Sequence, residues 1–96
     1  MVVVWSNSAK AELKKVYEYI ALDSLENAAM VKDSLIDLTI ELPEHPEKYP
    51  ADKFKKDNDG NWRAFEVYHY RISYRILKDQ IRVVRLRHTS RSPLNY

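Results

Sequence analysis

The side chains that could do chemistry in this sequence are mostly basic, and they lie in its second half. Residues 1–49 contain five lysines, no arginine and nine acidic residues, a net charge of −4. Residues 50–96 contain four lysines, seven arginines and five acidic residues, a net charge of +6. Because a guanidinium group binds phosphates and carboxylates through two hydrogen bonds, the clustered arginines favour an anion-binding surface. The alternative is that they form only the solvated face of a sheet.

Alternation along the chain places several of these arginines on one side of a strand. Arg71 and Arg75 alternate with an apolar stripe, so both side chains should project away from the core. Three more follow in the next strand, at Arg82, Arg85 and Arg87. Such a surface would hold a nucleic-acid backbone and stabilise the charge that develops on a phosphate during cleavage. If Arg71 points outward, replacing it with alanine should change the free energy of unfolding by at most about 0.5 kcal/mol. The alternative to a functional role is that Arg71 only pairs with a nearby acid such as Glu66.

RNA cleavage by a neighbouring 2′-hydroxyl also needs a general acid and a general base. His88 and Tyr96 are the candidates by residue type. Alternatively, neither residue is catalytic: His88 would be an imidazole hydrogen-bonded to backbone at the end of a strand, and Tyr96 would lie in a frayed chain end. A second basic segment surrounds Phe54 and could contact nucleic acid through Lys53, Lys55 and Lys56.

Several kinds of chemistry are absent from the sequence. It has no cysteine, which excludes thiolate zinc ligands, cysteine nucleophiles and disulfides, and which is typical of the reducing cytoplasm. The three histidines lack metal-ligand spacing and there is no glycine-rich phosphate loop, so we expect neither a metal nor a cofactor. No apolar run approaches the roughly 20 residues of a membrane-spanning helix, and no signal peptide is recognisable. We therefore expect a soluble, cytoplasmic protein without a membrane partner.

The first half of the sequence predicts a strand followed by two helices. Val2–Trp5 is a short β-branched and aromatic run, and polar residues after it can cap a helix. Apolar residues then recur every three or four positions in two segments, which end near Leu22 and at Leu42. Ser24 can cap the second helix, and Pro43 ends it because a proline excludes the next helical turn. The very short connection predicts an antiparallel helical hairpin.

The second half predicts an antiparallel sheet. A loop at 43–61, with three prolines and the only glycine, comes first. From Trp62 onward apolar and polar residues alternate in three segments, at 62–67, 70–77 and 81–87, joined by two tight turns. The N-terminal strand should lie at one edge of the sheet and the hairpin on one face. The sequence thus predicts a single α+β domain over residues 1–96, with an N-terminal strand, an antiparallel two-helix hairpin and a three-stranded antiparallel meander.

At this point the sequence resembles the RelE/ParE superfamily of toxins along nearly its whole length. The matching residues are Val4-Trp5-Ser6 with Ala9 and Leu13, Tyr19-Ile20, His45-Pro46, Tyr70-Arg71-Ile72-Ser73-Tyr74-Arg75, the Ile81 to His88 strand, and Thr89-Ser90-Arg91-Ser92-Pro93. Each match is weak, but their order and spacing are specific. The resemblance implies a RelE/ParE-like fold and the toxin of a type II toxin–antitoxin system, held inactive by a cognate antitoxin.

RelE-like members of the superfamily cut mRNA in the ribosomal A site with a concave basic face. On that pattern Arg71 matches the active-site arginine, and Tyr96 falls where some members keep a catalytic tyrosine. His88 and Arg91 complete the catalytic set that this resemblance implies. The sequence departs from the pattern after the last strand, because the expected basic position falls at Ser90 and Arg91 comes one place later.

The same resemblance extends the set of nucleic-acid contacts. Arg63 lies near a position that is lysine in RelE, whereas Phe65 replaces a second lysine. The residues that would bind nucleic acid are Lys53, Lys55, Lys56, Arg63, Arg75 and Arg87.

ParE-like members poison DNA gyrase and have no catalytic constellation of their own. The long helical hairpin, the His45-Pro46 segment and a His-x-Ser stretch at His88 resemble this group. The net charge of +2 also suits a protein-binding toxin better than a ribosome binder. ParE-like gyrase poisoning is therefore favoured over a RelE-like ribosome-dependent endoribonuclease, and only the latter would make the protein an enzyme. A non-toxic binding module of the same fold is the third hypothesis, because fold alone does not determine function.

Overall fold

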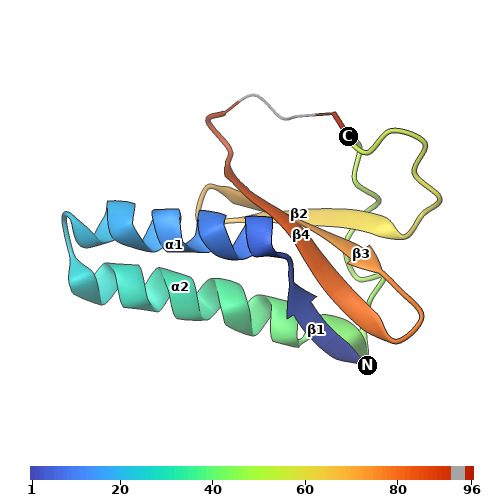
Figure 1. Cartoon of the computed structure of the whole chain (residues 1–96), viewed down its shortest axis with the longest axis horizontal. Helices are drawn as coiled ribbons and strands as arrows, with labels where there is room; N and C mark the ends of the chain where they lie inside the picture. Colours follow the sequence, from blue (N-terminus) through green and yellow to red (C-terminus); the bar gives the residue numbers. More distant parts are fainter. Residues whose placement is uncertain (92–94) are drawn as a thin grey trace.

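The computed structural model describes residues 1–91 and 95–96. In chain order the elements are β1 (Val2–Trp5), α1 (Asn7–Ala21), α2 (Leu25–Ile40), a short 3₁₀ helix η1 (Leu42–Glu44), β2 (Trp62–Val67), β3 (Tyr70–Ile76) and β4 (Gln80–His88) (Figure 1). The predicted strand, helical hairpin and meander are confirmed. Ser92 and Pro93, which belong to the last segment of the resemblance, lie outside the described residues.

The four strands form one sheet in the order β1-β4-β3-β2. β2, β3 and β4 are antiparallel, and β1 lies at the edge, parallel to β4. The helical hairpin packs on one face and extends beyond the end of the sheet (Figure 1). We call the opposite face the open face. Its residues are Trp62, Ala64, Glu66, Arg71, Ser73, Arg75, Arg82, Arg85 and Arg87.

Both α-helices begin at a capping serine. The hydroxyl oxygens of Ser6 and Ser24 each accept a hydrogen bond, 3.1 Å long, from the backbone amide three residues later. α2 ends at Ile40, two residues before the predicted end. Pro43 explains the difference, because it has no amide hydrogen and its ring favours the tighter turn of η1. Within the described part of the chain, neither helix has the length and apolar character needed to span a membrane.

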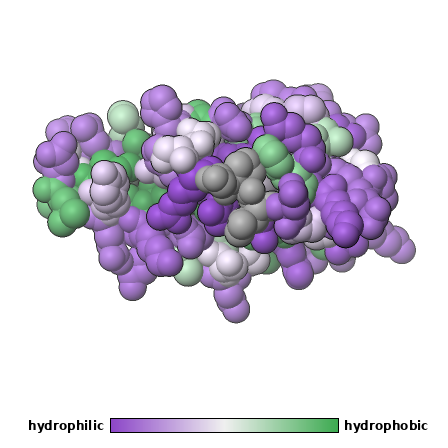
Figure 2. Space-filling view, turned by 90° about the horizontal axis from the view of Figure 1, so that it is seen from above, coloured by the Kyte–Doolittle hydropathy of each residue, from purple (hydrophilic) through white to green (hydrophobic). Residues whose placement is uncertain are grey.

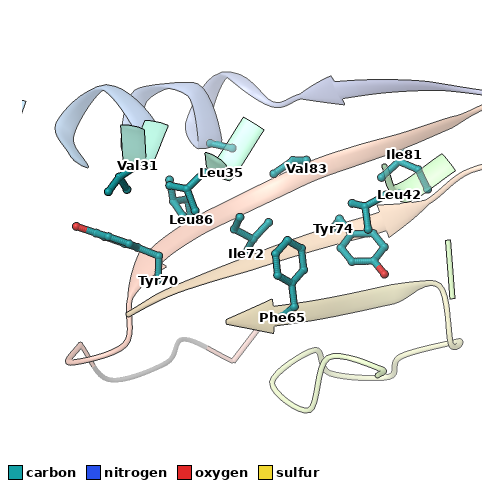
Figure 3. Packing of buried hydrophobic residues seen from close by; sticks show 11 residues of the cluster. Val31, Leu35, Leu42, Phe65, Tyr70, Ile72, Tyr74, Ile81, Val83 and Leu86 are labelled. Carbon is teal, nitrogen blue, oxygen red and sulfur yellow. The ribbon is translucent and has the colours of Figure 1, made fainter. Parts of the chain in front are cut away.

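The hydrophobic core lies between the hairpin and the covered face of the sheet (Figure 3). Leu35 of α2 and the strand residues Ile72, Tyr74 and Val83 have no exposed surface. Each such side chain contributes about 1.5–3 kcal/mol through burial. The hydroxyl of Tyr74 donates a hydrogen bond to the carbonyl of Pro46 at 2.8 Å, so its polar group is satisfied inside the core.

A β-bulge in β4 decides which arginines share a face. Ser73 pairs with Arg85, but Tyr74 pairs with Val83, so Val84 has no residue opposite it. Arg82 and Arg85 are three positions apart and would point to opposite faces of a regular strand. The extra residue brings both onto the open face.

Candidate functional site: a basic cavity on the open face

The loop before β2 folds back along that strand and over the open face. Ala51 forms an isolated antiparallel bridge with Arg63, and the amide of Asp52 donates to the carbonyl of Trp62 at 2.8 Å. The side chain of Asp52 is thereby fully buried. Its Oδ1 accepts a hydrogen bond from the amide of Phe54 at 3.0 Å, which stabilises the turn.

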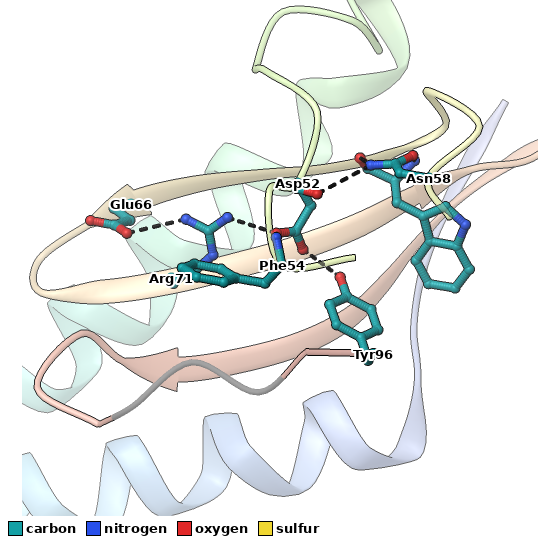
Figure 4. A network of polar contacts seen from close by, with 7 residues as sticks. Asp52, Phe54, Asn58, Glu66, Arg71 and Tyr96 are labelled. Atoms are coloured by element: carbon teal, nitrogen blue, oxygen red, sulfur yellow. Dashed lines mark hydrogen bonds and ion pairs between the residues drawn. The ribbon is translucent and has the colours of Figure 1, made fainter. Parts of the chain in front are cut away.

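Asp52 lies at the centre of a polar network (Figure 4). Its Oδ1 lies 2.8 Å from Nη2 of Arg71, and its Oδ2 accepts a hydrogen bond from the hydroxyl of Tyr96 at 2.5 Å. Nη1 of Arg71 lies 3.2 Å from Oε2 of Glu66, its partner across β2 and β3, so the pairing that was the alternative interpretation of Arg71 is present. The guanidinium group therefore bridges two carboxylates.

Arg71 is not the freely projecting side chain that alternation predicts. It does leave the sheet on the open face, but only 17% of its side chain is exposed. Removing it would leave the buried carboxylate of Asp52 without its counter-charge. Breaking such a buried pair typically costs about 3–5 kcal/mol, so the expected limit of 0.5 kcal/mol is wrong.

Burial and hydrogen bonding act in opposite directions on the pKa of Asp52. Burial raises this pKa, but hydrogen bonds from Tyr96, Arg71 and the Phe54 amide outweigh burial and hold it below 3.8. Burial, together with the hydrogen bond to Asp52, raises the pKa of Tyr96 to about 12. At neutral pH the tyrosine is thus a neutral donor to an ionised carboxylate.

Aromatic rings lie against three of the open-face arginines. The Cζ atom lies 4.8 Å from the ring centroid in the pairs Arg71–Phe54 and Arg75–Trp62, and 4.2 Å in the pair Arg85–Tyr96. Each contact is worth about 0.5–2 kcal/mol. The rings belong to the loop, β2 and the C-terminal segment, and the arginines belong to β3 and β4. These contacts therefore hold the loop, β2 and the C-terminal segment against β3 and β4.

A cavity of about 80 Å³ opens beside this network. All four residues predicted as catalytic line it, namely Arg71, His88, Arg91 and Tyr96. Two of the predicted nucleic-acid contacts, Lys53 and Arg87, line it as well. The structure therefore brings together the predicted catalytic set, whose members lie as far apart in sequence as Arg71 and Tyr96.

Three other predicted nucleic-acid contacts do not line the cavity. Arg75 lies against Trp62, and Nζ of Lys55 lies 4.8 Å from the centroid of the same ring. Lys56 is exposed in the loop, and its amide donates a hydrogen bond to the carbonyl of Tyr96. Arg75 therefore belongs to the open face, and Lys55 and Lys56 to the loop beside it, but none of the three lines the cavity.

Arg63 is separated from the other arginines. It pairs with Tyr74 in the sheet, so its side chain leaves β2 on the face opposite Arg71. Its guanidinium group donates to the carbonyls of Gly60 at 3.1 Å and Tyr49 at 2.7 Å. Arg63 therefore links the start of the loop, at Tyr49, to its end, at Gly60.

The groups that could carry an acid–base reaction are engaged within the protein. Arg71 is held by two carboxylates, and Tyr96 donates to one of them. Nδ1 of His88 accepts a hydrogen bond from the amide of Ser90 at 3.1 Å, and the Ser90 hydroxyl lies 2.7 Å away. Among the described residues, no three His, Asp or Glu side chains are grouped as a metal site. The cavity is therefore equipped to bind an anion more than to transfer protons.

Asp52 is the member of the site that sequence reasoning missed. It follows Pro50 and precedes a lysine, in a segment whose composition is typical of an exposed loop. Its burial depends on how the loop lies against β2, for which no local signal exists. Glu66, by contrast, follows from strand pairing with Arg71.

The fold and the site together define a small α+β protein with a basic, aromatic-lined binding face. The chain belongs to the ParE toxin family of the type II toxin–antitoxin system parDE, whose family model matches residues 3–93. Among solved structures, the chromosomal ParDE TA system from P. aeruginosa is similar, with a TM-score of 0.72 at 18% identity. The match covers 92% of this chain and 95% of the other, and it shows the same fold. Comparison with curated protein sequences finds no significant match.

Proposed function

We propose that this protein arrests bacterial growth by poisoning DNA gyrase and that a cognate antitoxin neutralises it. The observation that carries the proposal is membership of the ParE toxin family. The side chains that line the cavity also support the proposal, because two of the candidate catalytic residues, Arg71 and Tyr96, are already bound to Asp52. A poison that stabilises the gyrase–DNA complex needs binding surfaces and no acid–base pair of its own.

The tip of the helical hairpin offers one such surface. Tyr19, Leu22 and Leu25 are 74%, 86% and 67% exposed. Figure 2 shows hydrophobic side chains gathered at this end of an otherwise mostly hydrophilic face. Contiguous exposed apolar residues mark interaction sites, so the tip is suited to contact a protein partner.

Two assays test the proposal. The protein, induced alone, should stop growth, and co-expression of the antitoxin encoded beside it should restore growth. The purified protein, incubated with gyrase and plasmid, should trap cleaved DNA, whereas programmed ribosomes should yield no A-site-cut mRNA. If cells that contain the folded protein grow normally, the toxin hypothesis is rejected. The remaining hypothesis is then a non-toxic binding module of the same fold.

One observation favours a second candidate, a RelE-like ribosome-dependent endoribonuclease. The four residues that the resemblance marks as catalytic line one cavity. Tyr96→Phe separates the two functions because it removes only the hydroxyl. If Tyr96 acts on RNA, mRNA cleavage should fall by about 10²–10⁴, the contribution typical of a general acid or base. If the protein poisons gyrase, trapping should change little. Cut mRNA without trapped DNA would establish the endoribonuclease.

A further inference from the structure

Arg87 is an open-face arginine that the fold leaves without a counter-charge. Its Nε, like that of Arg75, is buried and has no hydrogen-bond acceptor among the described residues, and none of their carboxylates pairs with it. Of these two arginines, only Arg87 lines the cavity. Arg71, its neighbour across β3 and β4, is already bound by Asp52 and Glu66. A buried donor without an acceptor costs about 1–3 kcal/mol, which the side chain would recover by turning its guanidinium group towards a ligand oxygen in the cavity that it lines.

The cavity beside Arg87 has the charge and size of a small oxyanion site. Its cationic lining consists of Lys53, Arg71, Arg85, Arg87 and Arg91. Its two carboxylates, Asp52 and Glu66, are both engaged by Arg71. The volume of about 80 Å³ lies well below the roughly 300–1,000 Å³ of pockets that enclose whole small molecules. The cavity can therefore admit a phosphate-sized group but not a nucleobase with its sugar.

The surroundings of the cavity favour a polyanion over a single carboxylate. Arg75 and Arg82 pair across β3 and β4 and continue the positive charge along the open face. Residues 1–49, which form β1, the hairpin, η1 and the start of the following loop, carry a net charge of −4. A long polyanion is thus attracted to the sheet and repelled by the hairpin, which orients the molecule on it.

We propose that this cavity binds a backbone phosphate of duplex DNA, with Arg87 as the principal donor. The inference rests on the proposed gyrase function and deepens it, because it names the DNA of the gyrase complex as a partner of the open face. The hairpin tip then remains available for the protein part of the same complex.

The test measures binding of the full chain to a short fluorescent duplex over a series of salt concentrations. Arg87→Gln, which keeps much of the side-chain length, should weaken binding several-fold and reduce the slope of log K against log salt by about 0.9, the value of one phosphate contact. The control is Lys14→Ala on α1, whose side chain is 79% exposed, and it should match the parent. Circular dichroism checks folding, and Arg87→Lys should retain most of the slope if Gln disturbs the fold.

Three results would overturn the inference. The parent could bind no duplex, Arg87→Gln could keep the affinity and slope of the parent, or a polyglutamate peptide could bind through Arg87 in place of DNA. The gyrase assay separates this inference from the proposed function. If the parent traps cleaved DNA and Arg87→Gln traps as much, the phosphate site is wrong and the gyrase function stands. If the parent traps none, the gyrase function fails, and duplex binding still decides the phosphate site.

Discussion

The Arg71 guanidinium lies between a buried carboxylate and an exposed one. Asp52, at 2.8 Å, has no exposed side-chain surface, whereas the side chain of Glu66, at 3.2 Å, is 54% exposed. Solvent screens the second pair, and exposed ion pairs contribute only about 0–1 kcal/mol. Most of the stabilisation at this site therefore comes from Arg71 and Asp52.

Arg71→Ala is predicted to lower the free energy of unfolding by about 3 kcal/mol, the lower end of the range for breaking a buried pair. The buried Asp52 carboxylate would lose its counter-charge, although Tyr96 and the Phe54 amide would still donate to it. Glu66→Gln, the control at the exposed end of the same network, should cost less than about 1 kcal/mol. Urea denaturation measures both. Equal stability of Arg71→Ala and the parent would show that the buried pair is not formed.

The lowered pKa of Asp52 predicts how the free energy of unfolding responds to acid. Its pKa in the folded protein is lower than 3.8, so the unfolded chain takes up the proton first as the pH falls. The carboxylate therefore contributes stability that is fully present above 3.8 and is lost as the pH falls through the lowered pKa. Asp52→Asn lacks this contribution. Its stability deficit relative to the parent should shrink as the pH falls below 3.8, measured by thermal unfolding over that range. A constant deficit would contradict the lowered pKa.

At the scale of elements, the turn between β2 and β3 carries backbone strain. Tyr68 and His69 have φ angles of 52° and 65°, in the left-handed region that costs a non-glycine residue about 1–2 kcal/mol. Both lie between the paired residues Val67 and Tyr70, as in a two-residue type I′ hairpin. Asn-Gly is the usual sequence for such a turn, and this chain has Tyr-His instead.

Replacing Tyr68-His69 with Asn-Gly is predicted to raise the free energy of unfolding by about 1 kcal/mol, and Tm by about 4–8 °C, the shift expected for a domain of this size. The control is Lys78→Gly in the other tight turn, where the backbone φ is not positive. There glycine adds only freedom to the unfolded chain and should lower Tm. Calorimetry measures both variants. Stabilisation at both turns would mean that relief of left-handed strain is not the cause.

The bulge at Val84 leads to a prediction about the whole of β4. Deleting Val84 would make Val83 and Arg85 adjacent, and these two residues already pair with the consecutive residues Tyr74 and Ser73. β4 would then pair with β3 as a regular ladder, with Arg85 and Arg87 still on the open face. The deletion variant should therefore fold. Circular dichroism and NMR dispersion measure this, and an unfolded deletion variant would contradict the register.

At the scale of the whole molecule, stability and partner binding depend on different apolar residues. Leu35 is fully buried between α2 and the sheet, whereas Leu22 and Leu25 project from the hairpin tip. Leu35→Ala should cost about 2–5 kcal/mol. Leu22→Gln with Leu25→Gln should change stability by about 0.5 kcal/mol or less and still reduce growth arrest, since the tip is proposed to contact the target. Denaturation and growth curves measure the two effects, and unchanged arrest would remove the tip from the interface.

The sequence by itself determined the elements and the family of this protein. Residue periodicity is local, so the apolar stripe that includes Leu35 and the alternation around Ile72 predicted the helices and strands correctly. Pro43 marked the end of α2 to within two residues, and Glu66 was an acid close enough in sequence to be offered as an alternative partner of Arg71. All of these follow from backbone geometry over a few neighbouring residues.

Only the tertiary structure decided how the basic side chains are used. Asp52 becomes buried because the loop lies against β2, and that burial converts Arg71 from an exposed cation into half of a buried pair. The bulge at Val84 sets which face Arg85 and Arg87 occupy, and no residue type marks its position. Loop docking and strand register depend on contacts between distant segments. Periodicity within one segment therefore leaves undetermined which charges are neutralised and which, like Arg87, are left for a ligand.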